Sequence, residues 1–276
     1  PLTSTTQVIA QMTFHDIGRI GVPIFLMISG ALLLNRDYPD LSQFLKKRFA
    51  RIIYPFIFWI ILILGQLYFY NYNSTFIWKV FIGEPSITWY FWTLIGIYLF
   101  IPVINSFIKE YGEKGLKYFL AIWFIIMILK TFNAYPLWSY FDLSYFAGYI
   151  GYPILGYYLA NRKFKMSDSK VCLMGIIMLI VSLSVFVYLN YYKSPAIDLI
   201  YQNVPIIFMG TGLFLFIQYL DKTHKFDSIK GNFIGKAISS VILYSYVMYY
   251  SHVILVNFLS YHKPHIHLMF PVMFVL

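Results

Sequence analysis

Long apolar segments recur along the chain, separated by short polar loops. Each is roughly 20 residues long, the length that an α-helix needs to cross the hydrocarbon core of a bilayer. The fold class that this pattern predicts is all-α, a polytopic bundle of transmembrane helices. Nine segments are expected, at about residues 17–34, 52–70, 88–108, 117–132, 144–160, 171–190, 199–219, 239–260 and from 266 onward.

The composition supports a membrane protein. Of the 276 residues, 60% are hydrophobic, 21% are aromatic and only 12% are charged, whereas an ordinary soluble domain is about 25% charged. The mean hydropathy is +0.68. No soluble domain, repeat or low-complexity tract interrupts the pattern, so residues 1–276 are predicted to form a single membrane domain.

The basic residues predict how the chain is oriented. The loops at 36–51, 109–117, 162–170 and 222–236 contain sixteen Lys and Arg residues, and the rest of the chain contains five. Because cytoplasmic loops of membrane proteins are enriched in Lys and Arg, we place these four loops in the cytoplasm. The net charge of +10 is then a topology signal, and a nucleic-acid partner is not expected.

Both ends of the sequence are abrupt. It opens on Pro1 with a Ser/Thr-rich loop and stops at Leu276 within an apolar run. If the first segment runs from outside to inside, a cytoplasmic N-terminus requires one more span before Pro1. We therefore expect a domain truncated at both ends, with ten spans in the intact protein.

A basic helix, predicted over residues 41–51, runs directly into the second span. At 100° per residue, Arg48 falls on its apolar side, although a surface helix normally turns its charges outward. The residues that share this side are Leu41, Phe44, Leu45 and Ile52. Arg51 follows one turn later, so both guanidinium groups can reach one ligand.

A guanidinium group against apolar surface needs an anion, and its geometry fits phosphate or carboxylate. Lys47 lies to one side of this stripe, and Lys46 points away from it. The alternative is that these residues are ordinary positive-inside anchors at the lipid headgroups.

Two ionisable residues at or within predicted spans are further candidates. Arg19 lies at the outer end of the first segment and either extends to the interface or points inward to bind a polar acceptor. His252 lies inside the eighth segment, with Ser245 and Tyr249 on the same helical face. Such a histidine either has a function or is simply hydrogen-bonded by these hydroxyl groups.

Other patterns in the sequence give little evidence of a functional site. His15-Asp16 is explained by polar residues at a helix entry, with a catalytic dyad as the alternative. His262, His265 and His267 cluster loosely without a nearby carboxylate, and no metal site is predicted. Cys172 is the only cysteine, which excludes a disulfide within the chain. The sequence contains no Gly-rich phosphate loop, GxSxG or HExxH motif.

Five stretches in order resemble membrane acyltransferase family 3. They are GVPIFLMISGALLL, FLKKRFARIIYPFIFW, WYFWTLIGIYLFIP, GYPILGYYL and SYVMYYSH. Each is weak alone because apolar strings match easily. Together with the arginine pair, they cover nearly the whole chain in the order typical of the family.

The resemblance implies a ten-span enzyme that O-acylates cell-surface glycans or their lipid-linked precursors in the cytoplasmic membrane of a bacterium. Its donor would be cytoplasmic acyl-CoA, typically acetyl-CoA, and no bound cofactor is implied. Arg48 and Arg51 match the family's Arg-x-x-Arg motif for the donor, with Lys47 beside them. His252 and Arg19 are the catalytic candidates.

The resemblance leaves further expectations. Trp89 and Tyr249 are candidates for contact with the substrate. The family's principal catalytic histidine belongs to its first span, which would precede Pro1, and His15 is no substitute. Residues 1–276 alone are therefore expected to be inactive. A succinyl donor is also compatible with the sequence.

Two other classes of function remain as alternatives. A polysaccharide exporter of similar fold could use the same bundle, although the sequence shows no Gly/Pro-broken helices in symmetry-related halves and places nearly all acidic residues, the candidates for ion coupling, in loops. A purely structural membrane subunit would not explain an arginine pair on an apolar face.

Overall fold

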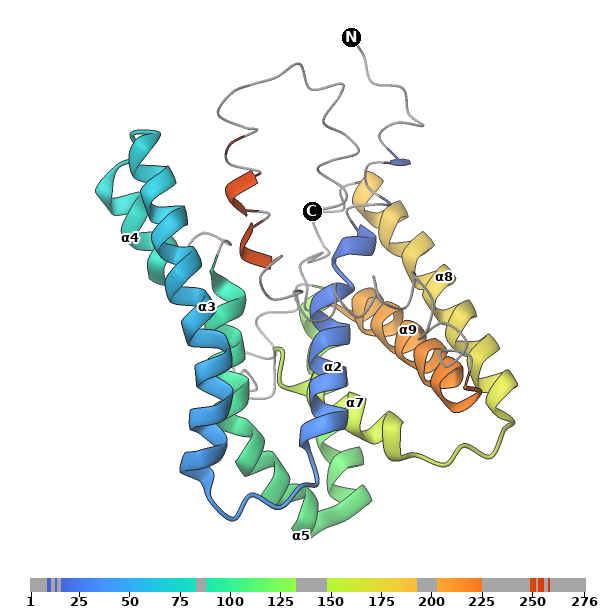
Figure 1. The fold of residues 1–276 in the computed structure, drawn as a ribbon. Coiled ribbons are helices and arrows are strands. Elements are labelled where there is room, and N and C mark those ends of the chain that lie inside the picture. Colours follow the sequence, from blue (N-terminus) through green and yellow to red (C-terminus); the bar gives the residue numbers. More distant parts are fainter. Residues whose placement is uncertain are drawn as a thin grey trace. The chain divides into compact units, whose positions relative to one another are not determined.

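The computed structural model describes residues 9–10, 13, 16–82, 88–132, 148–192, 203–224, 249–251, 253–255 and 258. These residues form helices and turns, with no strand among them, which confirms the all-α prediction. The helices, drawn in Figure 1, are α2 (Gly21–Leu33), α3 (Leu41–Phe69), α4 (Ser74–Ile82), α5 (Trp89–Thr131), α7 (Gly151–Asn161), α8 (Asp168–Tyr192) and α9 (Val204–Lys222).

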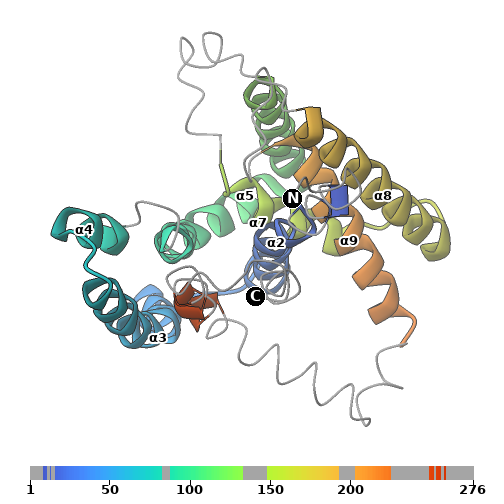
Figure 2. The ribbon, with the colours of Figure 1, turned by 90° about the horizontal axis from the view of Figure 1, so that it is seen from above.

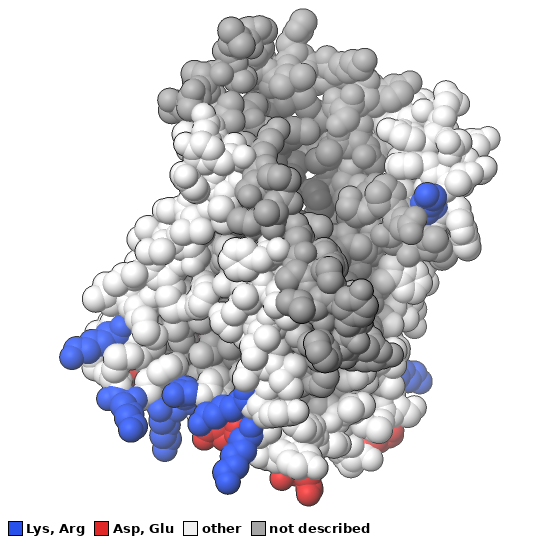
Figure 3. Space-filling model, turned by 180° about the vertical axis from the view of Figure 1, so that it is seen from behind, with Lys and Arg blue, Asp and Glu red and all other residues white. Residues whose placement is uncertain are grey.

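Helices in the described part of the chain are long and apolar enough to cross a membrane. Five qualify, at Asp16–Leu33, Leu41–Phe69, Trp89–Thr131, Asp168–Leu189 and Val204–Lys222. Their outward faces carry large apolar side chains, such as Tyr54, Phe58 and Ile61 on α3. Figure 3 shows the corresponding contrast on one face, where a few charged side chains stand apart from broad surfaces without charge. These are the surfaces of a polytopic membrane protein.

The described helices agree with most predicted segments and differ from the prediction in three details. The segments at 88–108 and 117–132 are the two arms of α5, which breaks at Gly112. Within the segment at 144–160, residues 148–150 form a turn and α7 begins at Gly151, while residues 144–147 lie outside the described part of the chain. The helix α4 was not expected. Most of 239–260, and the segment from 266 onward, lie outside the described residues.

Gly112 explains the break in α5. A straight helix of 43 residues would be about 65 Å long, twice the thickness of a hydrocarbon core of roughly 30 Å. Gly112 has φ 56° and ψ −144°, a conformation that is nearly restricted to glycine. Just beyond the break, Gly115 lies against the side chains of Phe107 and Tyr111. The backbone can therefore reverse within a few residues.

The chain divides into two compact units. The first comprises Pro1–Arg36 and Val103–Phe226, and the second comprises Asp37–Pro102 and Asp227–Leu276.

In the first unit, glycines allow two helix pairs to pack closely. A Cβ atom on Gly30 of α2 would collide with the backbone of Pro153 of α7, and one on Gly156 would collide with that of Met27. The glycines of α8 and α9 meet in the same way at Gly175 and Gly212, and Figures 1 and 2 show these two helices side by side. Small residues at such contacts are typical of helix pairs in membranes.

Polar groups fix the ends of helices in the first unit. The Asn203 side chain accepts a hydrogen bond from the Ile206 amide at 3.1 Å and so caps α9. The amide of Val204, the residue after Asn203, donates a hydrogen bond to the Thr131 hydroxyl at the end of α5, at 3.0 Å. The buried indole of Trp123 donates to the Gly148 carbonyl at 3.0 Å. These bonds connect α5 to α9 and to the turn before α7.

Among the described elements of the second unit, α3 is the longest. Asp40 caps it by accepting a hydrogen bond from the Gln43 amide at 3.0 Å. Its buried side is formed by Phe44, Ile52, Phe56, Ile60, Ile63 and Leu67. Phe56 stacks on Phe91 of α5 with 3.7 Å between ring centroids. Further along α3, the Gln66 amide donates to the Ile254 carbonyl at 2.9 Å.

Candidate functional site

Arg48 occupies a position in the buried stripe of α3. The stripe advances by four residues from Phe44 to Arg48, Ile52 and Phe56, and Arg48 is the one polar member of this run. Its guanidinium carbon lies 5.8 Å from the centroid of the Phe44 ring. The side chain is half-buried, so part of it is withdrawn from solvent.

In the structure, the buried side of α3 begins later in the helix than the sequence predicted. Leu41, predicted to share the side of Arg48, is 51% exposed, and Leu45 is only half-buried. Leu41 is the first residue of α3, directly after the Asp40 cap, and lies too early to reach the packed stripe. Burial begins instead at Phe44, whose ring lies 4.3 Å from that of Tyr38.

Arg48, Arg51 and Lys47 line one small hollow of about 220 Å³. The other residues around it are Asp37, Tyr38, Pro39, Asp40, Gln43 and Phe44. Lys46 is exposed and is not among these described lining residues. The sequence predicted that Lys46 points away from the other three cations, and the structure agrees with this orientation.

Arg51 is more exposed than Arg48. Both guanidinium groups act electrostatically on the buried phenol of Tyr98 in α5, within the same unit. The charges of the arginine pair therefore act on a neighbouring helix as well as on the hollow.

Arg19 interacts with the protein interior of the first unit. Its Nε lies 4.0 Å from a carboxylate oxygen of Asp16, which is fully buried, while the Arg19 side chain is 21% exposed. Its guanidinium carbon is also 5.7 Å from the centroid of the Phe186 ring. Of the two orientations considered for Arg19, this placement corresponds to the inward one. His15 lies outside the described residues.

Trp89 and Tyr249 both contact Tyr90 in the second unit. The ring centroids are 5.6 Å apart for Trp89 and Tyr90, and 5.4 Å apart for Tyr249 and Tyr90. The two substrate-binding candidates, far apart in sequence, are thus brought to one aromatic cluster.

His252 lies outside the described residues, as do His262, His265 and His267. Within the described part of the chain, no group of three or more His, Cys, Asp or Glu residues could hold a metal ion.

Sequence reasoning missed a larger cavity in the first unit. It has a volume of about 880 Å³ and is lined from the end of α2, the break in α5, the end of α7 and the loop that follows α7. Four of its lining residues are the cations Lys109, Arg162, Lys163 and Lys165. The signal for it was present, because these cations belong to loops that were interpreted only as topology signals.

A family model described as an acyltransferase domain matches residues 2–276. No curated protein and no solved structure matches the chain. The match covers the arginine pair of α3, Arg19 and the aromatic cluster around Tyr90, and it agrees with a bundle of membrane helices. The chain therefore belongs to membrane acyltransferase family 3.

Proposed function

We propose that this membrane acyltransferase transfers an acyl group, most simply acetyl, from cytoplasmic acyl-CoA to a hydroxyl group of a cell-surface glycan or of its lipid-linked precursor. The enzyme would act in the cytoplasmic membrane of a bacterium. The observation that carries this proposal is the place of Arg48, a half-buried cation in an otherwise apolar stripe of α3, beside a hollow that Arg51 and Lys47 also line.

The chemistry of the hollow suits phosphate groups. Two guanidinium groups one helical turn apart can each present a fork of N–H donors, and Lys47 adds a third positive charge. Asp37 and Asp40 also line the hollow, and the Asp40 carboxylate is engaged in capping α3. Three cations against two carboxylates leave a net positive charge for an anionic ligand.

The size of the hollow restricts what it can hold. Its volume of about 220 Å³ is below the range of about 300–1,000 Å³ that is usual for small-molecule sites. We therefore assign to it the phosphate groups of the donor and not the complete nucleotide. The donor's thioester would extend from this anchor toward the acceptor.

In the transfer itself, the acceptor hydroxyl oxygen attacks the thioester carbonyl, a C–O bond forms and the C–S bond breaks. The hydroxyl proton must be taken up by a base, and the departing thiolate must be protonated. A histidine such as His252 could serve as the base. A guanidinium group does not serve as a base in proteins, so the role of Arg19 would be to stabilise negative charge or to orient the acceptor.

The test uses the complete protein in its native membrane. Arg48→Ala and Arg51→Ala should each abolish most transfer of radiolabelled acetyl groups to surface glycan, with membrane insertion unchanged on an immunoblot of the membrane fraction. Lys46→Ala, which removes an exposed cation from the same helix, is the matched control and should retain activity. Equal effects of all three substitutions would contradict the assignment.

Deletion of the gene distinguishes an enzyme from an exporter. For an enzyme, Arg48→Ala and the deletion should both leave the amount of exported glycan unchanged and remove only its acyl groups. Accumulation of glycan inside cells in which the gene is deleted would indicate export as the primary activity.

A further inference from the structure

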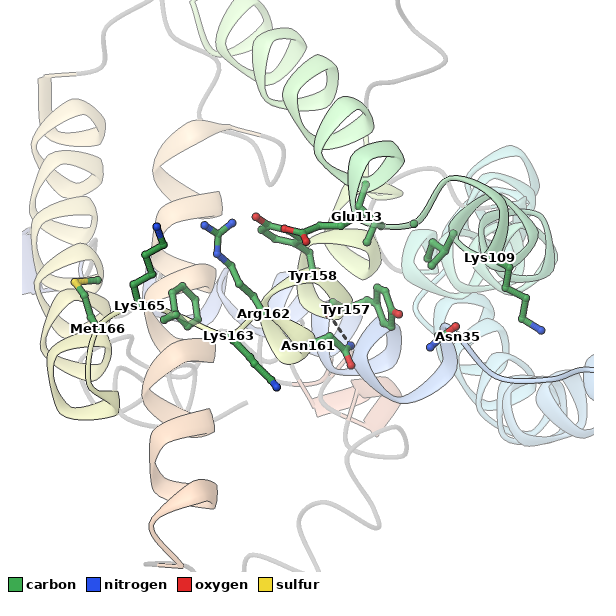
Figure 4. A pocket seen from close by; sticks show the side chains of 14 residues that line it. Asn35, Lys109, Glu113, Tyr157, Tyr158, Asn161, Arg162, Lys163, Lys165 and Met166 are labelled. Carbon is green, nitrogen blue, oxygen red and sulfur yellow. Dashed lines mark hydrogen bonds between the residues drawn. The ribbon is translucent and has the colours of Figure 1, made fainter.

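The cavity of the first unit has the size of a small-molecule site. Its volume of about 880 Å³ lies within the range of about 300–1,000 Å³ typical of ligand pockets. Its closed side is apolar, because Ile108, Leu116 and Tyr157 are all buried there. Figure 4 shows the polar side chains arranged around it, including Asn35 and Asn161.

The open side of the cavity is positively charged. Lys109, Arg162, Lys163 and Lys165 line it, against one carboxylate, that of Glu113. This carboxylate is already engaged, because Lys117 lies 2.8 Å from it and the charge of Arg162 also acts on it. The cavity therefore presents a net positive field next to an apolar wall.

Two aromatic rings hold Arg162 in place. Its guanidinium carbon lies 5.1 Å from the centroid of the Tyr158 ring and 5.7 Å from that of the Phe164 ring, and Figure 4 shows it beside Tyr158. Stacking uses the flat face of a guanidinium group and leaves its in-plane N–H donors able to bind an anion. A cation that only sets the orientation of the chain in the membrane would not need these two aromatic contacts.

We propose that this cavity is a second anion site, which binds a phosphate ester. The phosphate would face Arg162, Lys163 and Lys165, and the apolar or planar part of the ligand would lie against the buried wall. Such a ligand has two possible sources, the headgroup of an anionic phospholipid or a soluble phosphorylated metabolite such as a nucleotide. The residues that line this cavity differ from those that line the hollow beside Arg48, and the proposal does not depend on the acyl donor.

The test measures binding to the complete protein in nanodiscs of neutral phosphatidylcholine. In one arm, adenosine 3′,5′-bisphosphate is titrated and followed by calorimetry, both in the wild type and in Arg48→Ala, which removes binding at the donor hollow. In the other arm, phosphatidylglycerol is added to the nanodiscs and bound lipid is counted by native mass spectrometry. Inorganic phosphate is included to measure the contribution of the apolar wall.

The variants are Arg162→Gln, Lys165→Gln and the control Lys170→Gln. Lys170 is an exposed cation of α8 and is not among the described residues that line the cavity. Loss of a charged partner should weaken binding of the phosphate ester about tenfold or more, whereas Lys170→Gln should leave it unchanged. Thermal unfolding of each variant, compared with the wild type, shows whether the bundle remains folded.

Each outcome either supports or contradicts the proposed site. Binding of the nucleotide that is weakened only by the two cavity variants supports the site with a soluble ligand, and the same pattern in the lipid arm supports a headgroup. If neither probe binds, or if Lys170→Gln weakens binding as much as the cavity variants, these cations act only through their general charge and the site does not exist. Nucleotide binding that remains in Arg48→Ala and is weakened by Arg162→Gln is binding at this cavity, which separates this result from failure of the donor assignment.

Discussion

Gly30 of α2 lies directly against the backbone carbonyl of Pro153 of α7, at a distance that leaves no space for a Cβ atom. Gly156 makes the reciprocal contact with the backbone of Met27. This pair of contacts fixes how closely α2 and α7 approach each other. Even a methyl side chain at Gly30 or Gly156 would force these helices apart.

Gly30→Ala should therefore destabilise the first unit. Overpacking a close contact typically costs about 1–3 kcal/mol, and here the obstacle is backbone, which cannot rotate away. The measurement is the thermal unfolding temperature of the purified protein in detergent. Gly21→Ala is the control in the same helix, since a Cβ atom there meets nothing within 4 Å. A similar loss in both variants would show that the contact is not the cause.

Gly112→Ala should also be destabilising, for a different reason. A Cβ atom at Gly112 would meet nothing within 4 Å, so the cost of about 1–3 kcal/mol comes from the backbone conformation alone. Gly96 belongs to the same helix and also has space for a Cβ atom, so Gly96→Ala should be tolerated. Chemical denaturation of both variants would separate these effects. An unchanged stability of Gly112→Ala would mean that the break in α5 does not need this glycine.

Trp123→Phe should show what the hydrogen bond to Gly148 contributes. Phenylalanine keeps most of the apolar contact with Tyr152, whose ring centroid lies 5.3 Å away. It leaves the Gly148 carbonyl without the indole donor, at a cost of about 1–3 kcal/mol in a buried place. The free energy of unfolding is the quantity to measure. Trp78→Phe, at a side chain that is 60% exposed, should change it little.

Arg48→Lys should test geometry separately from charge. Lysine keeps the positive charge but loses the planar fork of donors that can bind a phosphate group bidentately. Acetyl transfer by the complete protein should fall about tenfold at low donor concentration, as expected for one lost charged hydrogen bond. The control, Lys46→Arg, should retain full activity. Activity restored to the wild-type level by lysine at position 48 would show that charge alone is sufficient.

The helices could be predicted because apolar length is a strong signal in membranes. The segments that became α2, α8 and α9 agree within a few residues with those predicted at 17–34, 171–190 and 199–219. The break in α5 was predicted only as a loop, since sequence does not reveal that Gly112 alone turns the backbone. The turn at 148–150 before α7 was also missed, because an apolar run does not show where a helix begins.

The candidate sites were predictable in part. Helical spacing correctly separated Arg48 from Lys46, because burial follows the same periodicity along α3. Helical spacing did not predict that Leu41 is exposed, because Leu41 is the first residue of α3, next to the Asp40 cap. The cavity around Arg162 depends on contacts between α5, α7 and their loops, and no pattern within one segment encodes these.

The end of α7 is fixed by one side chain of another helix. The last carbonyl groups of a helix have no partner within it, and in the 11 residues of α7 they make up about a third of the element. The Gln218 side chain of α9 donates to the Leu159 and Ala160 carbonyls, at 3.4 and 3.3 Å. One primary amide thus satisfies two of these carbonyl groups and holds the point from which the chain continues to Arg162.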